Sequence, residues 1–318
     1  MKTLVTGANG FIGRAVCTEM QRGGWQVTGA VRSSHQLPAG VALTSISAID
    51  GETDWFEALR GVDAIIHLAA RSSLTHDTAA DSLAAFRAVN AAGTLNLARQ
   101  AAAAGAKRFV FISSAKVNGE RTQTGQAFIE ADQPKPQDAY AQSKHEAELG
   151  LREIAADTGM ELVIIRPPLV YGPGVKGNFA ALMRAVQRGW PLPLGAVQNQ
   201  RSLVALDNLV DFIVICAAHP QAANQTFLVS DGHNLSTPEL LRGLALAASV
   251  PVRLLPVPVW ALQAGAALLG KGDAVQRLCG NLQVDISKAR SLLGWLPPIS
   301  CDEGLRRTLG VELHEKII

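Results

Sequence analysis

The sequence predicts an α/β protein in which a doubly wound parallel sheet, with helices on both faces, precedes a smaller mixed α/β lobe. Two observations lead to this prediction. Short apolar runs alternate with longer segments of helical periodicity up to about residue 166, which is typical of parallel sheets. Runs such as 64–68 are almost continuously apolar, as expected of strands that are buried on both faces.

Six strands and two long helices are expected before Arg166. The strands are Lys2–Thr6, Gln26–Val31, Val41–Ile46, Ala64–Leu68, Arg108–Ile112 and Leu162–Ile165. The long helices, with apolar residues at helical spacing, are 79–104 and 139–156. After Arg166, proline and glycine mark loops, and shorter helices are expected near 178–188, 207–217, 236–248 and 302–309. We therefore expect a larger domain at residues 1–166 and a smaller lobe at residues 167–318.

The composition is that of an ordinary globular protein, with 48% hydrophobic and 18% charged residues among 318. The sequence contains 29 basic and 27 acidic residues, so its net charge is +2. We therefore expect no nucleic-acid partner and no broad anion-binding surface. The cysteines at 17, 216, 279 and 301 lack the spacing of a metal site or a disulfide framework. We expect reduced, buried thiols and no metal.

Two segments bear on location. The chain enters its first strand directly after Met1, without room for a secretion signal, which predicts a cytoplasmic protein. The stretch 254–270 is the most apolar later segment, but Pro256 and Pro258 interrupt it, and it is shorter than the ~20 residues of a membrane span. We expect this stretch to be buried or interfacial, and no membrane span.

Three glycines, Gly7, Gly10 and Gly13, directly follow the first strand and open a helix. In this position the first permits a tight turn, the second lets the backbone approach a pyrophosphate, and the third allows close packing of helix and strand. Free amides at the helix N-terminus then bind the phosphates. The arrangement predicts a Rossmann-type domain that binds a dinucleotide, with further contacts from Asn9, Phe11 and Ile12.

The end of the second strand bears on the choice of cofactor. An acidic residue there would accept hydrogen bonds from the adenosine ribose of NAD, but this chain has Arg32 and Ser33. A guanidinium and a hydroxyl suit a 2′-phosphate, so NADP(H) is favoured. In the alternative interpretation Arg32 is a solvated strand-end residue, and NAD(H) binds through its pyrophosphate.

Tyr140 and Lys144 lie one helical turn apart on the same face of a predicted helix. A nearby lysine and a positive nicotinamide both favour the phenolate, so we expect the pKa of Tyr140 to fall from its usual ~10 toward neutrality, where it can act as general acid or base. Ser114 follows a predicted strand at the carboxyl edge of the sheet, where doubly wound folds bind ligands. These three residues are the candidate catalytic set.

With these motifs in order, the chain resembles the extended short-chain dehydrogenases/reductases, in their nucleotide-sugar epimerase, dehydratase and reductase branch. The resemblance spans nearly the whole chain and rests on further motifs, at residues 67–70, 90–94, 113–114 and 166–173. It implies that Ser114 hydrogen-bonds the reacting sugar oxygen, Tyr140 exchanges its proton, and Lys144 orients the nicotinamide ribose. It also places Leu68, Ala69, Ala70, Asn90 and Pro167 near the cofactor.

The resemblance implies a substrate site as well. Arg201 matches an arginine that pairs with the substrate diphosphate, Arg277 matches a second one more loosely, and Asn178 matches an asparagine near the phosphates. We expect Asn118 to contact the sugar, because it stands where the family has a tyrosine that borders the sugar. This replacement puts the identity of the sugar in doubt. For Ser113 and Arg166 purely structural roles remain open.

The resemblance to this branch implies reduction of a UDP-4-keto-6-deoxy-(N-acetyl)hexose in bacterial surface-polysaccharide precursor synthesis. The alternative is a UDP-glucose or UDP-N-acetylglucosamine 4-epimerase with retained NAD. The missing acid at Arg32 favours the reductase, because tight NAD retention favours an acid there. A dehydratase fits less well, since Ala115 and Lys116 replace its acid/base pair. A non-catalytic dinucleotide sensor is the remaining alternative, and a homodimer is expected.

Overall fold

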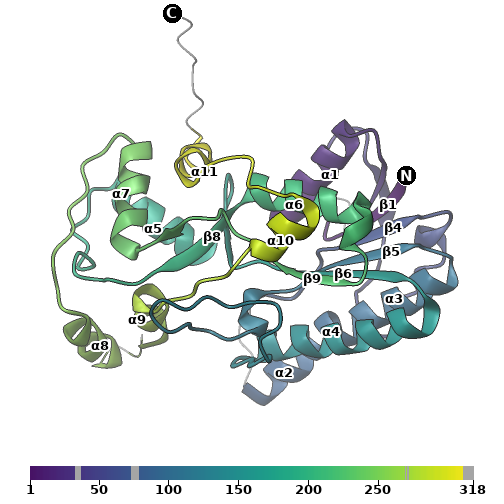
Figure 1. Ribbon diagram of the computed structural model, residues 1–318, viewed down its shortest axis with the longest axis horizontal. Coiled ribbons are helices and arrows are strands. Elements are labelled where there is room, and N and C mark those ends of the chain that lie inside the picture. The colour runs from purple at the N-terminus through teal and green to yellow at the C-terminus, as the bar shows by residue number, and fades with distance from the viewer. Residues whose placement is uncertain (33–36, 73–78, 269, 271, 311–318) are drawn as a thin grey trace, which may run out of the picture.

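A parallel sheet covered by helices on both faces forms the larger part of the computed structural model, which describes residues 1–32, 37–72, 79–268, 270 and 272–310 (Figure 1). Within these residues the sheet has seven strands in the order β3-β2-β1-β4-β5-β6-β9, and all neighbouring pairs are parallel. The strands are β1 (Lys2–Thr6), β2 (Gln26–Val31), β3 (Ala42–Ser45), β4 (Ala64–His67), β5 (Arg108–Ile112), β6 (Glu161–Arg166) and β9 (Gln225–Leu228). The predicted doubly wound Rossmann-type architecture is confirmed.

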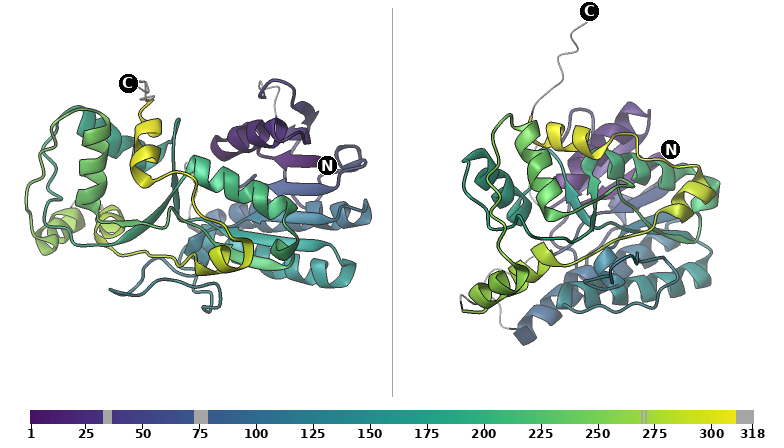
Figure 2. Two further views of the ribbon diagram at one scale, coloured as in Figure 1. Left: turned by 45° about the horizontal axis from the view of Figure 1, so that its top comes forward. Right: turned by 60° about the vertical axis from the view of Figure 1, so that its left-hand side comes forward.

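Two hydrophobic cores cover the two faces of this sheet. Because successive strand residues point to opposite faces, Val5 packs into one core and Leu4 into the other. The Val5 core includes α1 (Phe11–Arg22), α6 (Leu206–Ala218) and α10 (Ser287–Leu293). The Leu4 core includes α3 (Thr94–Ala103) and α4 (Ala139–Thr158), beside which α2 (Ala79–Arg87) lies (Figure 2). Strands buried in this way explain the continuous apolar runs.

All six predicted strands match within one residue at each end. The seventh strand, β9, was not predicted, and the sheet therefore includes residues from beyond Arg166. Its four residues lie in a region rich in loops, where so short a run carries little periodic signal. The expected helix over 79–104 is interrupted by a π-helical segment, Ala88–Gly93, between α2 and α3.

The smaller lobe lies beside the carboxyl ends of the strands (Figure 1). It contains a mixed sheet in the order β10-β8-β7, as predicted for this part of the chain. Its strands are β7 (Leu169–Tyr171), β8 (Arg201–Ala205) and β10 (Asn234–Leu235). Its helices are α5 (Gly177–Gln187), α7 (Thr237–Ala247), α8 (Val259–Leu268), α9 (Gly272–Cys279) and α11 (Cys301–Thr308). A third core, which includes Tyr171, Phe179 and Leu241, holds this lobe together.

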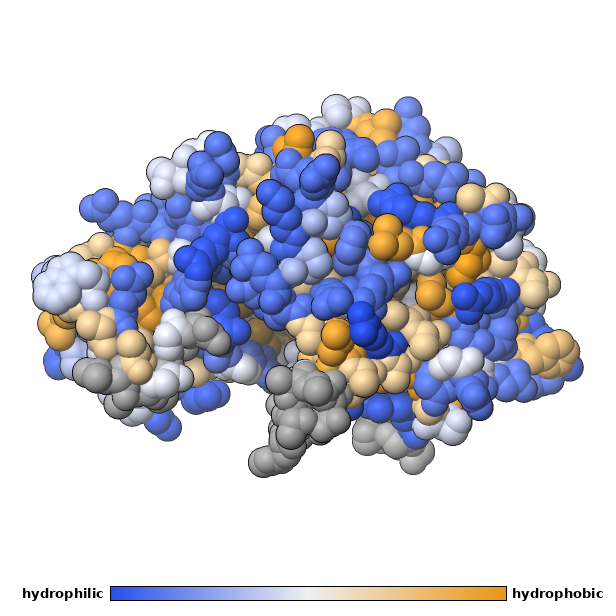
Figure 3. Space-filling model, turned by 90° about the horizontal axis from the view of Figure 1, so that it is seen from below, coloured by the Kyte–Doolittle hydropathy of each residue, from blue (hydrophilic) through white to orange (hydrophobic). Residues whose placement is uncertain are grey.

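The apolar stretch 254–270 forms α8 at the surface of this lobe. Leu255 and Trp260 are exposed, Trp260 by 72%, while Ala266 is buried, so the stretch is only partly covered. The face of the molecule seen in Figure 3 is mainly hydrophilic, with small apolar patches. Over the described ranges, no helix has the length and apolar character needed to cross a bilayer. The cysteines are free thiols, three of them buried and Cys279 partly exposed.

Candidate active site

The glycine turn after β1 has the geometry that a dinucleotide requires. Gly7 has φ +67°, and a Cβ there would lie 2.9 Å from the backbone nitrogen of Ala69. At Gly13 a Cβ would lie 2.1 Å from the carbonyl oxygen of Gly7. Gly10 is the N-cap of α1 and brings no side chain to its first amides, which are the groups that bind phosphates. The residues present therefore fit a dinucleotide diphosphate, as the sequence predicted.

The other predicted cofactor residues surround this turn. Leu68, Ala69 and Ala70 follow β4, which pairs with β1, and Ala69 packs directly against Gly7. Pro167 is buried after β6, where its carbonyl accepts a hydrogen bond from the amide of Ala115 at 2.9 Å. These strand ends meet at the carboxyl edge of the sheet, where a cofactor in the glycine turn would lie. Asn9 and Ile12, in the turn and in the first turn of α1, are half-buried.

The proposed contacts to a 2′-phosphate lie at the end of β2. Arg32 is exposed, immediately after the last residue of that strand. Ser33 lies outside the described residues, so the pair of groups proposed there is seen only in part. Neither Val31 nor Arg32 offers the carboxylate that would bind an adenosine ribose.

Ser114, Tyr140 and Lys144 meet where β5 ends and α4 begins. Ser114 and Tyr140 line a pocket, while Lys144 is 1% exposed beneath it. The ammonium of Lys144 donates to the carbonyl of Ile112 at 2.8 Å and lies 4.4 Å from the ring centre of Phe111. The predicted catalytic set is thus brought together by one strand end and one helix.

The electrostatics of this set differ from the sequence-based expectation. Burial, with a further contribution from Asp138, raises the pKa of Tyr140 to about 12 instead of lowering it. Burial lowers the pKa of Lys144 to about 7, against a smaller opposing effect of Glu148. Lys144 turns its ammonium to the carbonyl of Ile112, and the protein's own residues therefore do not activate the phenol. The prediction that the pKa of Tyr140 falls is therefore wrong as far as the protein's own residues are concerned. Of the two groups expected to favour the phenolate, only the positive nicotinamide remains.

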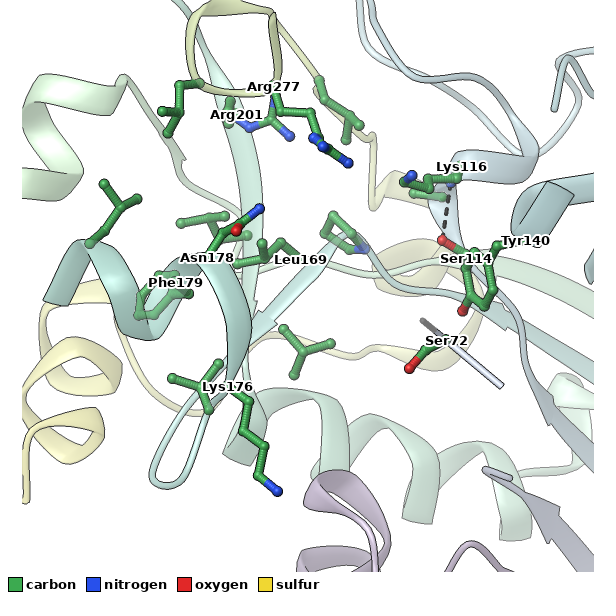
Figure 4. Close-up of a pocket in the computed structure, with 18 of the residues that line it drawn as sticks. Ser72, Ser114, Lys116, Tyr140, Leu169, Lys176, Asn178, Phe179, Arg201 and Arg277 are labelled. Atoms are coloured by element: carbon green, nitrogen blue, oxygen red, sulfur yellow. Dashed lines mark hydrogen bonds between the residues drawn. The ribbon is translucent and has the colours of Figure 1, made fainter. Parts of the chain in front are cut away.

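Two charged residues that the sequence did not assign to the site lie beside Ser114 and Tyr140. Lys116 and Asp138 both line the pocket, and their side chains form an ion pair. Asp138 also caps α4, since its carboxylate accepts from the amide of Ala141 at 2.6 Å. The amide of Lys116 donates to the hydroxyl of Ser114 at 3.2 Å (Figure 4). Their closeness in sequence to Ser114 and Tyr140 was the available signal.

The pocket has a volume of about 1230 Å³ and runs from the sheet to the smaller lobe. Ser114 and Tyr140 lie at one end, and Asn178, Arg201 and Arg277 lie across from them (Figure 4). The guanidinium of Arg201 donates to the carbonyl of Gly280 at 3.0 Å, and burial lowers its pKa. Apolar side chains line much of the space between the two ends. The pocket thus joins a proton-transfer set to a pair of guanidinium groups suited to phosphate.

Two predicted contacts are held within the protein instead. Asn118 is 1% exposed and does not line the pocket, because its oxygen accepts from Arg166 at 2.9 Å and its nitrogen donates to the carbonyl of Ile129 at 3.0 Å. The prediction that Asn118 binds the sugar does not agree with this geometry.

Asn90 is also buried. Its oxygen accepts from the amide of Arg71, and its nitrogen donates to the carbonyl of Arg71 and to Ser143. The amide thereby joins the segment after β4 to the helix that carries Tyr140. This geometry indicates that Asn90 supports the cofactor site by positioning its walls.

Comparison with known proteins shows the family of this chain. Residues 3–230 match the model of the NAD dependent epimerase/dehydratase family, and the chain belongs to that family. The chain is 48% identical to a UDP-glucose 4-epimerase of Vibrio cholerae over 96% of its length and 93% of that protein. It is also 28% identical to an Escherichia coli O157:H7 N-acetyl-alpha-D-glucosaminyl-diphospho-ditrans,octacis-undecaprenol 4-epimerase, over 98% of this chain and 96% of that one.

Solved structures give the same result. A UDP-glucose 4-epimerase of Thermotoga maritima, crystallised with UDP-glucose, superposes with a TM-score of 0.78 at 26% identity over 98% of each chain. A Thermus thermophilus UDP-glucose 4-epimerase in complex with NAD shares the fold, with a TM-score of 0.78 at 23% identity over 98% of each chain. The resemblance to the nucleotide-sugar branch, and with it an enzyme, is confirmed. The predicted preference for NADP finds no support in these relatives.

Proposed function

We propose that the protein is a UDP-sugar 4-epimerase that works with NAD. The observation that carries this proposal is one continuous pocket with Ser114 and Tyr140 at one end and Arg201 and Arg277 at the other. A nucleotide sugar has the matching chemistry, with reactive hydroxyls at one end and a diphosphate behind them. The Vibrio cholerae relative, at 48% identity, supports the epimerase over the reductase favoured by the sequence.

Tyr140 and Ser114 carry out and support the proton transfer at the C4 oxygen. Ser114 hydrogen-bonds this oxygen while the phenolate of Tyr140 accepts the hydroxyl proton, and Tyr140 later returns it. A dinucleotide whose diphosphate is held at the glycine turn would supply a hydride acceptor and donor for C4 and, on its nicotinamide, a positive charge that favours the phenolate. The protein's contribution is to hold the sugar oxygen and the proton in place.

The far end of the pocket holds the diphosphate. Arg201 and Arg277 present guanidinium groups to its oxygens, with Asn178 as a further donor. If the diphosphate stays bound there, the keto sugar can turn and present its other face to the cofactor without leaving the pocket. Binding energy remote from C4 thereby serves to retain the intermediate.

A second candidate, the 4-ketoreductase, is favoured by one observation. Arg32 directly follows β2, where an acid would hold the NAD ribose, so the cofactor has one fewer anchor and can exchange after each turnover. A reductase needs this exchange, whereas an epimerase needs a retained cofactor. The same residue supports the earlier NADP preference, although the family is described by NAD.

One experiment separates these candidates. Purified protein is incubated with UDP-glucose, UDP-N-acetylglucosamine or a UDP-4-keto-6-deoxy-hexosamine, with NAD(H) or NADP(H). The epimerase proposal predicts copurified NAD and interconversion of the UDP-sugars without net cofactor consumption. Stoichiometric oxidation of NAD(P)H by the keto sugar would establish the reductase instead. Tyr140→Phe should abolish either reaction, and a wild type as inert as this variant on every substrate would indicate the sensor.

The remaining expectations belong to this proposal. A cytoplasmic location suits an enzyme that uses nucleotide sugars and NAD, and the UDP-hexose product would serve surface-polysaccharide synthesis. The homodimer also remains a prediction, which sedimentation of the purified protein would check.

A further inference from the structure

A buried ion pair lies behind the pocket, and the reaction described above does not use it. Glu148 and Arg166 are 1% and 3% exposed, and two guanidinium nitrogens of Arg166 donate to the two carboxylate oxygens of Glu148. Ser113 donates to the same carboxylate at 2.6 Å. Asn118 accepts from a third nitrogen of Arg166 at 2.9 Å. Four side chains from α4, β6 and the segment after β5 thus form one closed network.

Each end of this network adjoins a catalytic group. Ser113 directly precedes Ser114, and its amide donates to the carbonyl of Ile165 at 2.7 Å. Glu148 follows Lys144 by one helical turn on the same face of α4. The network therefore joins the segment that carries Ser114 to the helix face that carries Lys144. A displacement of the Glu148 side chain would therefore affect both Ser114 and Lys144.

Glu148 is the charged group that acts on Lys144 electrostatically. Of the titratable and charged groups around Lys144, Tyr140 and Glu148 lie one helical turn before and after it on α4. His67 on β4 is influenced by its charge, and Arg166 on β6 pairs with Glu148. Burial and the charge of Lys144 lower the pKa of His67 to about 3, so that its ring is neutral. Burial disfavours the charged form of Lys144, and the carboxylate of Glu148 opposes that effect by raising the pKa of Lys144. Among these groups Glu148 is the carboxylate, and its geometry is fixed by the ion pair with Arg166.

We propose that Glu148, held in place by Arg166 and Asn118, is a positioning residue that favours the ammonium form of Lys144 and fixes the segment that carries Ser114. Its relevance to catalysis rests on the proposed function. The proposal also gives Asn118 a role. This residue departs from the family pattern, and its amide fixes the outer edge of the guanidinium instead of contacting the sugar.

The test is the titration of Lys144 itself, which needs no sugar substrate. Protein labelled with ¹³C at the lysine Cε is titrated by NMR, and the Lys144 resonance is the one missing in Lys144→Met. Glu148→Gln keeps the shape and an acceptor oxygen but removes the charge, and its Lys144 pKa should fall below the native value. Glu148→Asp keeps the charge and should leave this pKa close to native. Glu146→Gln, on the exposed side of the same helix, is the matched control and should change nothing.

Kinetics give the second readout. In Glu148→Gln the limb of the kcat profile that reports Lys144 should move to lower pH, whereas KM for the UDP-sugar should stay within about twofold, because the diphosphate is bound elsewhere. A pKa fall of one unit would reduce the ammonium fraction at pH 7 about fivefold, and kcat at pH 7 with it. Lack of turnover in the wild type would reject the proposed function but leave the NMR result valid.

Folding must be separated from positioning. If Glu148→Gln does not fold because Arg166 is left unpaired, Glu148→Gln with Arg166→Met removes both charges and allows the same titration. A folded variant with a native Lys144 pKa and a native pH profile would overturn the proposal. Loss of folding in both variants would likewise overturn it, since the pair would then serve stability alone.

Discussion

At the scale of single residues, the structure displaces the two key pKa values in opposite directions. The pKa of Tyr140 is raised to about 12 and that of Lys144 is lowered to about 7, in both cases mainly by burial. At neutral pH the protein therefore holds a protonated phenol beside a partly neutral lysine. The helical spacing of the two residues predicted that they share a face. It did not reveal that Lys144 is buried and Tyr140 half-buried, which depends on how α4 packs against β5.

Asp138→Asn tests the control of Tyr140 by its neighbour. Asparagine caps helices about as well as aspartate, so stability should change by less than about 1 kcal/mol. Removing the negative charge should lower the pKa of Tyr140, because Asp138 contributes to raising it. The limb of the pH–rate profile that reports Tyr140 should move to lower pH. An unchanged limb would show that Asp138 does not act on the phenol.

Gly13→Ala tests the close contact in the cofactor turn. The added Cβ would lie 2.1 Å from the carbonyl oxygen of Gly7, so that the turn must open. We expect a loss of about 1–3 kcal/mol in the free energy of unfolding and at least a tenfold weaker Kd for NADH. Gly265→Ala is the control, because nothing lies within 4 Å of its new Cβ and alanine favours a helix. Equal NADH affinities in the two variants would contradict the role of Gly13.

At the scale of elements, the sheet and its helices were largely predictable, whereas the contacts between elements distant in sequence were not. Apolar runs and a glycine-rich turn defined β1 to β6 and the start of α1, because those features are local. The strand β9 pairs with β6 across about sixty residues, and no local pattern reveals such a partner. Likewise, Asn118 resembled a pocket residue by position, but its burial against Arg166 depends on three separate elements.

Asn90→Ala tests one of these contacts, the one between the segment after β4 and α4. The side-chain amide of Asn90 joins the backbone at Arg71 to Ser143 on α4, and its removal leaves the half-buried backbone amide and carbonyl of Arg71 without this partner. We expect the variant to lose about 1–3 kcal/mol in the free energy of unfolding, measured in urea. It should also bind NADH more weakly, since the segment after β4 borders the cofactor turn. A free energy of unfolding equal to that of the wild type would show that the hydrogen bonds of Asn90 are dispensable.

At the scale of the whole molecule, two lobes share one pocket, and neither lobe contains all of its functional groups. The proposed proton-transfer set comes from the end of the large sheet, and the two arginines proposed to bind the diphosphate come from the smaller lobe. The net charge of +2 fits this division, because phosphate recognition is local and needs no basic surface. The sequence predicted both groups of residues, but only the fold shows that they face one cavity.

Acid should destabilise the molecule through His67. The folded ring has a pKa of about 3, below its value of 6.5 in an unfolded chain, so the unfolded state binds more protons as the pH falls from about 6.5 toward 3. Stability should accordingly be higher at pH 7.5 than at pH 4.5, as measured by Tm. The variant His67→Gln should show a weaker dependence over this range. An equally steep dependence would assign the effect to other groups.

The central claim is that one retained cofactor takes a hydride from C4 of a UDP-sugar and returns it in the same pocket. The direct measurement uses UDP-glucose that carries deuterium at C4, incubated with the purified protein without added cofactor and followed by NMR. The proposal predicts UDP-galactose that keeps the deuterium at C4. Loss of the label to solvent, or no product from UDP-glucose and from the matching N-acetylglucosamine compound, would contradict it.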